Sequence, residues 1–423
     1  MKLRTALPGL LAFAAIGLAQ DNAFLLRNVT VHPVTSADVS AASLLVRDGV
    51  IAEIGAAKTK PPKGMLVIDG AGLHVYPGMI DSATSLGLTE IGAVRETSDI
   101  SELGDFEPQL RALIAVNPSS EHIPVARANG VTAAVTLPGG GVIAGQGALI
   151  RLDGWTWEEM ALQAPAAMML RFPILTMSAG EPPERPRRIP YAEAKKKHEE
   201  TLEKLRVFFE DARRYQKSKA ATPGLPVDRR FEAMLPVLDG KLPVIVRANR
   251  ERAIQEALEF AAREKIRMIL AEPREFGAAL ATVKARGIPV ILGPTHTLPV
   301  EEDAAYDSQY SLPGELHRQG IPFAFGTFDS ADVRNLPYQA AAAVPFGLPR
   351  EEAFKAVTIN AARIWGVDGK LGSIEVGKSA DFILTDGDPL ETRTQVRKVF
   401  IRGREASVET RHTRLYEKYL NRP

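Results

Sequence analysis

Short apolar runs, each followed by a helical pattern, recur through the second half of the chain and constrain its fold class. Four such runs start at residues 242, 266, 288 and 321, which are 24, 22 and 33 residues apart. This spacing fits the strand and helix unit from which parallel sheets are built. The runs are continuously apolar, as expected for strands buried on both faces. About eight such units fit between residues 77 and 365, which favours a (β/α)8 TIM barrel, with a doubly wound sheet as the alternative.

Both ends of the chain have a different pattern, typical of short antiparallel strands. Residues 24–76 contain several β-rich runs, with an Asp-Gly turn at 48–49 that is typical of a tight hairpin. Strand-like runs return at 380–384 and 399–402. We therefore expect both ends to form one domain around the barrel. The expected parts are a composite β-sandwich domain (20–76 and 366–423), a TIM-barrel domain (77–365) and, within the barrel domain, a helical insertion (181–226).

The first 19 residues have the pattern of a secretory signal peptide. Lys2 and Arg4 precede an apolar run at 6–18, and small residues precede a cleavage site after Ala19. A membrane anchor is the alternative, but this run of 13 residues is shorter than the roughly 20 that cross a bilayer. We therefore expect a periplasmic or secreted protein that has no membrane attachment after cleavage.

The charge balance and residue types exclude several classes of function. The chain has 52 Lys and Arg against 51 Asp and Glu, a net charge of +1 that becomes −1 without residues 1–19. This is not the basic excess of a nucleic-acid-binding protein. The chain has no Cys, which excludes disulfides, a thiolate nucleophile and a Cys-ligated zinc site. Any His-rich metal site would have to be made from its 7 His.

Three motifs are spread over nearly the whole chain. They are Val-Tyr-Pro-Gly-Met-Ile-Asp at 75–81, a Gly-rich strand-like stretch at 143–154, and a C-terminal series made of Gly326, 335–337, Ala361, 372–378, 380–381 and 387–389. In this order they resemble the amidohydrolase superfamily, specifically its imidazolonepropionase-like branch. The resemblance implies a TIM barrel with a composite β-sandwich domain. It also implies zinc or another divalent metal at the carboxyl ends of the barrel strands, where it activates a water that attacks a C–N bond.

The metal ligands that the resemblance implies are replaced in this chain. Ala83 and Ser85 occupy the positions of two His after the first barrel strand, Arg247 that of the ligand on strand 5, and Glu272 that of the His on strand 6. Ala has no donor atom, and the Arg guanidinium stays protonated. Asp329 keeps an acid near the end of strand 8, where the family has a metal-binding Asp that takes the proton from the water. We therefore expect a degenerate site that retains no metal cofactor.

Arg247 supplies a fixed positive charge where the metal would lie. We expect it to pair with Glu272, Asp329 or both, and an Arg247 side chain that points into solvent is the alternative. Of the His residues, His296 follows a predicted strand at the expected functional end of the barrel. It is expected either to assist substrate binding or proton transfer or to be an exposed loop residue.

Two functions remain open. The first, which the resemblance implies, is a hydrolase of C–N bonds in cyclic or peptide-like amides, with Asp329 or Glu272 as base and His296 assisting. The second is an inactive pseudoenzyme that binds a small molecule in the barrel mouth or pairs with an active paralogue; family analogy also suggests a homodimer. The chemistry favours the second, because generating hydroxide near neutral pH needs the metal.

Overall fold

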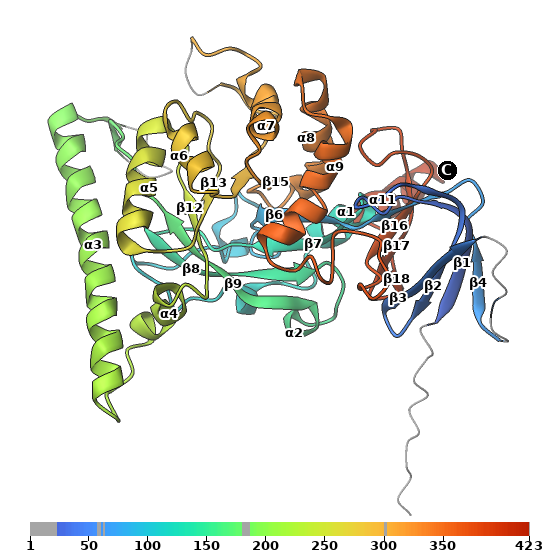
Figure 1. The fold of residues 1–423 in the computed structure, drawn as a ribbon, viewed down its shortest axis with the longest axis horizontal. Coiled ribbons are helices and arrows are strands. Elements are labelled where there is room, and N and C mark those ends of the chain that lie inside the picture. Colours follow the sequence, from blue (N-terminus) through green and yellow to red (C-terminus); the bar gives the residue numbers. More distant parts are fainter. Residues whose placement is uncertain (1–22, 57–60, 62–63, 180–186, 300–302, 423) are drawn as a thin grey trace, which may run out of the picture.

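The computed structural model of the protein describes residues 23–56, 61, 64–179, 187–299 and 303–422. These residues form a barrel with surrounding helices and a separate sheet domain at one side (Figure 1). Residues 1–19, where a signal peptide is expected, lie outside the described residues. Within the described ranges, no helix is long and apolar enough to cross a membrane.

Eight strands form the barrel sheet, in the order β15-β14-β13-β12-β9-β8-β7-β6. The two end strands lie close to each other. A hydrogen bond shows this, since the N–H of Phe328, just after β15, donates to the carbonyl of Ala83 in β6 at 2.7 Å. The α/β barrel predicted from the apolar runs is therefore confirmed. The strands are β6 (Met79–Thr84), β7 (Val131–Thr136), β8 (Ile143–Arg151), β9 (Ala161–Arg171), β12 (Val244–Arg247), β13 (Met268–Ala271), β14 (Val290–Leu292) and β15 (Phe323–Phe325).

One strand departs from the regular (β/α)8 pattern. β8 is antiparallel to both β7 and β9, whereas the other neighbouring pairs of the barrel sheet are parallel. The short loop between β7 and β8 contains Gly140 and Gly141, whose φ values of +78° and +45° are left-handed and suit glycine. This loop reverses the chain without a helix, so the expected series of eight strand and helix units is interrupted here.

Helices surround the barrel, and the long helix α5 buries an apolar stripe against it. In α5 (Glu251–Glu264), Ile254, Leu258 and Ala261 are buried at spacings of four and three residues, and the helix ends at Lys265, whose φ is +53°. The other helices next to the barrel are α1 (His122–Ala128), α2 (Trp157–Met160), α6 (Ala279–Ala285), α7 (Ser308–Gln319), α8 (Leu336–Ala342), α9 (Arg350–Ala356) and α10 (Ile359–Ile364). Four 3-10 helices are η1 (Arg95–Thr97), η2 (Ala112–Ala115), η3 (Asp332–Asn335) and η4 (Val344–Phe346).

The helix expected within the insertion is present as α3 (Tyr191–Ala221), which lies along one edge of the molecule beside α4 (Arg229–Leu238) and α5 (Figure 1). The short strands β10 (Ser178–Ala179) and β11 (Arg187–Arg188) pair just before it. Its Phe209 packs edge-on against Phe260 of α5, with ring centroids 5.2 Å apart. The apolar stripe of this charged helix therefore covers the outside of the barrel. Its buried side chains are Ala194, His198, Leu205, Phe208, Phe209 and Ala212.

The second sheet joins both ends of the chain, as predicted. β5 pairs with β16 in antiparallel register, and the Phe382 and Phe400 rings of the C-terminal strands pack with Phe24 of the N-terminal one. The composite domain is therefore confirmed. The sheet has the order β18-β17-β16-β5-β1-β2-β3, with β4 paired to β1. Its elements are β1 (Phe24–Val31), β2 (Val39–Arg47), β3 (Val50–Ala56), β4 (Leu66–Asp69), β5 (His74–Pro77), β16 (Phe382–Thr385), β17 (Val396–Ile401) and β18 (Arg404–Ala406), followed by α11 (Arg411–Leu420).

Gly326 allows the last barrel strand to approach the first one closely. A Cβ atom at this position would lie 2.8 Å from the Cβ atom and 2.9 Å from the backbone nitrogen of Ala83. We expect Gly326→Ala to lower the free energy of unfolding by about 2 kcal/mol, because the backbone has to shift. Urea unfolding measures this. Gly369→Ala is the control, since nothing lies within 4 Å of a Cβ atom there. Equal stability of the two variants would contradict the close approach.

Candidate functional site

The carboxyl ends of the parallel barrel strands place two arginines side by side. β9 ends at Arg171 and β12 ends at Arg247, and the two residues are register partners in the parallel pair. Each follows a run of buried apolar residues, so it is the first charged side chain beyond the packed part of its strand. Glu272 follows the next strand, β13, in the same way. This end of a barrel is where active sites of the fold are built.

Arg247 and Glu272 form an ion pair in which Nε of Arg247 donates to Oε2 of Glu272. The guanidinium carbon also lies 5.5 Å from the ring centroid of Phe328, a cation–π contact. The Arg247 side chain is 41% exposed and that of Glu272 19%. The expected pairing of Arg247 with Glu272 is therefore confirmed. Asp329 is not part of it, because no ion pair between Arg247 and Asp329 occurs among the described residues.

Two residues at this mouth have a left-handed backbone. Glu272 and Phe328 both have a φ of +53°, which costs of order 1 kcal/mol or more for a residue other than glycine. The Glu272 side chain also passes over Gly293, where a Cβ atom would lie 2.8 Å from Cγ of Glu272. Both residues that contact Arg247 therefore have an unfavourable backbone conformation. Such conformations cluster at functional sites.

Asp329 and His296 are engaged elsewhere. The exposed Asp329 carboxylate accepts the N–H groups of Ala331 at 2.7 Å and Asp332 at 3.0 Å, so it caps the turn that begins η3. His296 is exposed in the loop after β14, and its ring centroid lies 6.1 Å from that of Tyr310. Within the part of the chain that the structure describes, no hydrogen bond or ion pair joins either residue to the other or to Glu272. The structure therefore assembles two of the four predicted site residues.

Asp81 lies directly below the mouth and ties the first barrel strand to the last. Its carboxylate accepts the N–H groups of Ala83 and Thr327, both at 3.1 Å, and the Thr327 hydroxyl at 2.6 Å. The side chain is fully buried, and this burial raises the pKa of Asp81 to about 7, against the lowering effect of the hydrogen bonds. The motif at 75–81 includes this residue, but its sequence alone does not indicate that the carboxyl bridges two strands.

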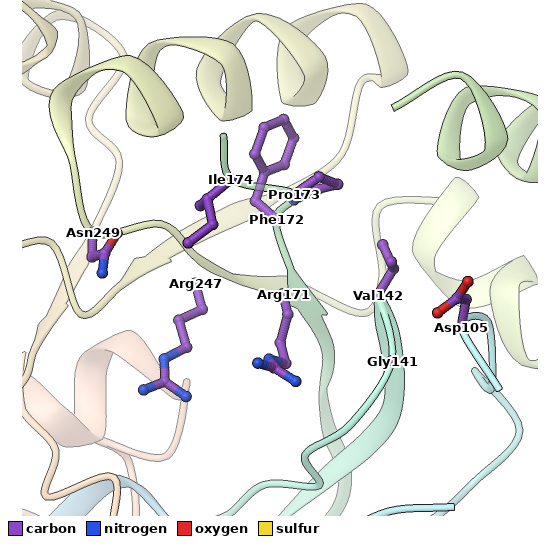
Figure 2. A pocket seen from close by; sticks show the side chains of 9 residues that line it. All are labelled: Asp105, Gly141, Val142, Arg171, Phe172, Pro173, Ile174, Arg247 and Asn249. Carbon is purple, nitrogen blue, oxygen red and sulfur yellow. The ribbon is translucent and has the colours of Figure 1, made fainter. Parts of the chain in front are cut away.

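Arg171 is a site residue that the sequence predictions missed. It lines a cavity of about 470 Å³ together with Arg247 and Asn249 (Figure 2). Both arginines also line a neighbouring cavity of about 260 Å³ beside Phe328. Burial and, next, the nearby Arg247 lower the pKa of Arg171, while Glu272 opposes them. The sequence feature that could have identified it is the apolar run Ala-Ala-Met-Met-Leu-Arg, which ends in Arg in the same way as Val-Ile-Val-Arg in β12.

Comparisons with known proteins agree with this architecture. Residues 229–406 match the model of the Amidohydrolase family. The structure is similar to the crystal structure of an amidohydrolase from Thermotoga maritima MSB8, with a TM-score of 0.79 and 27% identity over 91% of this chain and 99% of that one. The chain belongs to the amidohydrolase superfamily. It is thus a member of a superfamily of hydrolases, and its sequence motifs are similar to those of the imidazolonepropionase-like branch.

Curated relatives of this chain match it over part of their length. An imidazolonepropionase from Syntrophobacter fumaroxidans is 39% identical over 75 residues, which are 18% of this chain and 14% of that protein. The amidohydrolase tasK from Hapsidospora irregularis is 22% identical over 392 residues, 85% of this chain and 39% of that protein. The chain therefore spans well under half the length of these two relatives in the matched regions.

The side chains at the mouth of this amidohydrolase do not fit a catalytic metal. Such a site commonly takes three protein ligands from His, Cys, Asp or Glu. Among the residues that the structure describes, no group of three or more of these side chains could hold a metal ion. Ala83 lies in the last part of β6 and Ser85 just beyond it, and the Glu272 carboxylate accepts a hydrogen bond from Arg247. The catalytic roles expected for Asp329, Glu272 and His296 stay predictions.

Proposed function

We propose that this protein is a pseudoenzyme of the amidohydrolase superfamily that binds a small-molecule ligand at the barrel mouth and does not hydrolyse it with a metal-activated water. The observation that carries the proposal is the ion pair of Arg247 with Glu272 at two adjacent strand ends. A guanidinium has no lone pair for a metal, and its charge opposes a second cation at the same place. The Glu272 carboxylate keeps one oxygen free of Arg247, but a single carboxylate does not make up the three protein ligands of a usual catalytic zinc site.

The space at the mouth supports ligand binding. The cavity of about 470 Å³ beside Arg171 and Arg247 lies within the range of small-molecule sites, roughly 300–1,000 Å³. Its wall combines the apolar side chains of Phe172 and Ile174 with a few polar groups. This combination is typical of pockets that orient a ligand. The signal-like pattern of residues 1–19 supports a further proposal, that the ligand is met in the periplasm or outside the cell.

Metal loading tests the proposed function. The purified protein is incubated with Zn²⁺ or Mn²⁺, passed through a desalting column and analysed for metal content. It is then assayed against dipeptides, N-acyl amino acids and cyclic amides. We expect no stoichiometric metal and no metal-dependent hydrolysis, because the mouth lacks a set of ligands. A zinc-loaded metallohydrolase serves as the positive control. One retained metal ion per chain, together with hydrolysis that a chelator abolishes, would overturn the proposal.

A further inference from the structure

The two arginines at the mouth leave one positive charge without a partner. Glu272 is bonded to Nε of Arg247, whereas the Arg171 side chain has no hydrogen bond or ion pair to any of the described residues. Arg171, Arg247 and Glu272 together carry a net charge of +1, and Asp105, which lines the same cavity as the two arginines, adds one negative charge to its wall. Neighbouring strands lie about 4.8 Å apart, so the two guanidinium groups repel each other unless an anion lies between or beside them.

The free donors of both guanidinium groups face the same space. Arg247 uses Nε for Glu272, and its Nη atoms have no hydrogen-bond partner within the described ranges. Figure 2 shows the Arg171 and Arg247 side chains extending from neighbouring strands in the same direction, and both line the two adjoining cavities. The Phe328 ring and the Glu272 carboxylate hold the Arg247 side chain in place. The donors of Arg247 are therefore oriented before any ligand arrives, which limits the entropy lost on binding.

We propose that Arg171 and Arg247 together form the recognition site for a small-molecule carboxylate. This inference rests on the proposed function and names the class of its ligand. Planar guanidinium groups match the geometry of oxyanions, and charge-assisted hydrogen bonds are the strong ones. A carboxylate carries one negative charge and a phosphate monoester about −1.5 to −2 at neutral pH, so a carboxylate adds less negative charge beside Glu272 and Asp105, which also lines the cavity.

A second polar group on the same wall supports a ligand with more than a carboxylate. The side-chain oxygen of Asn249 is buried and has no hydrogen-bond partner among the described residues, and Asn249 lines the same cavity as the two arginines. A buried acceptor without a partner is costly unless it bonds to a ligand or water. We infer that the ligand carries, in addition to its carboxylate, a hydrogen-bond donor such as a hydroxyl or amide N–H that donates to the Asn249 oxygen.

Binding measured in the presence of EDTA tests the carboxylate site. The probes are benzoate, its neutral analogue benzamide, and inorganic phosphate, titrated into the full chain with calorimetry and ligand-observed NMR. We expect benzoate to bind and benzamide to bind at least tenfold more weakly, because charge-assisted hydrogen bonds are lost. Arg171→Met is expected to weaken benzoate binding about tenfold or more. Arg214→Met, on the exposed face of α3, is the matched control and should leave binding unchanged.

A variant with the opposite expected effect makes the test independent of simple unfolding. Glu272→Gln removes the competing negative charge but keeps a side-chain oxygen that can accept from Nε of Arg247, so benzoate is expected to bind several-fold more tightly. Absence of benzoate binding, equal binding of benzoate and benzamide, or binding unaffected by Arg171→Met would each overturn the proposal. Preference for phosphate over benzoate would identify a phosphate site instead. Because EDTA is present throughout, metal-dependent hydrolysis would overturn the proposed function separately and would leave these binding results unchanged.

Discussion

Arg151→Met is expected to lower the free energy of unfolding by about 3 kcal/mol. Arg151 is the last residue of β8, and its Nε atom lies 3.4 Å from Oδ1 of Asp381, the residue just before β16. The two side chains are only 11% and 3% exposed. This pair therefore joins the barrel to the sheet domain in a buried place. Removal of Arg151 leaves the buried Asp381 carboxylate without its ion-pair partner, which is far more costly than loss of a surface pair.

The pH dependence of this loss identifies its cause. Burial already raises the pKa of Asp381, and Arg151 lowers it. Without Arg151 the pKa of Asp381 rises further, so the folded variant takes up a proton that the unfolded chain has released. The variant's stability therefore falls as the pH rises, and the loss relative to wild type is larger at pH 8 than at pH 5.

Urea unfolding at both pH values measures the effect of Arg151→Met. The control is Lys398→Met, which breaks the exposed pair of Lys398 with Glu405 and should cost less than about 1 kcal/mol. The double variant Arg151→Met/Asp381→Asn should recover part of the loss, because no buried charge remains. A loss of the same size at pH 5 and pH 8 would mean that packing, and not the charge of Asp381, determines it.

Much of the barrel could be predicted because its strands are buried on both faces. The runs that begin at residues 242, 266, 288 and 321 form β12, β13, β14 and β15. A short, continuously apolar run is best buried as a strand that is covered on both faces. The direction of β8 could not be predicted in this way. A buried strand has the same apolar pattern whether its neighbours are parallel or antiparallel, and only the turn at Gly140 and Gly141 indicates that the chain reverses.

The candidate site was predictable where charged residues directly follow such strands. Arg247 and Glu272 each come after an apolar run, so their positions at one end of the barrel follow from the strands alone. Asp329 lies a few residues beyond its strand, and its orientation depends on the turn that its own carboxylate caps. Arg171 was missed because Gln163 and Pro165 interrupt the pattern of β9, which hides the strand and its register.

Asp81→Asn is expected to make the protein more stable than wild type at pH 8 and about equally stable at pH 4. The folded-state pKa of Asp81 is about 7, above the ordinary value of 3.8. Between these two values the folded chain holds a proton that the unfolded chain has lost. The contribution of Asp81 to stability is therefore fully present below about pH 4 and is lost as the pH rises to about 7, at up to about 1.4 kcal/mol per pH unit.

Asparagine can make the same hydrogen bonds as the protonated Asp81 and does not ionise. Its side-chain oxygen can accept the N–H groups of Ala83 and Thr327, and its NH2 group can donate to the Thr327 hydroxyl oxygen. The Thr327 hydroxyl then donates to the backbone carbonyl of Asp329, which lies 3.2 Å away. The bridge between β6 and the end of β15 is therefore preserved without a buried charge, which is why the variant gains stability only at high pH.

The difference between the unfolding free energies of Asp81→Asn and wild type, measured from pH 4 to pH 8, isolates this group from the other carboxylates. Asp69→Asn is the control with the opposite sign, because a hydrogen bond from Asn28 lowers the pKa of the exposed Asp69 and so favours its ionised form in the folded state. If Asp81→Asn is less stable than wild type at pH 8 and nearly equal at pH 4, then the folded protein stabilises the ionised carboxylate. The buried bridge between β6 and the end of β15 would then hold a negative charge at neutral pH, and the raised pKa assigned to Asp81 would be wrong.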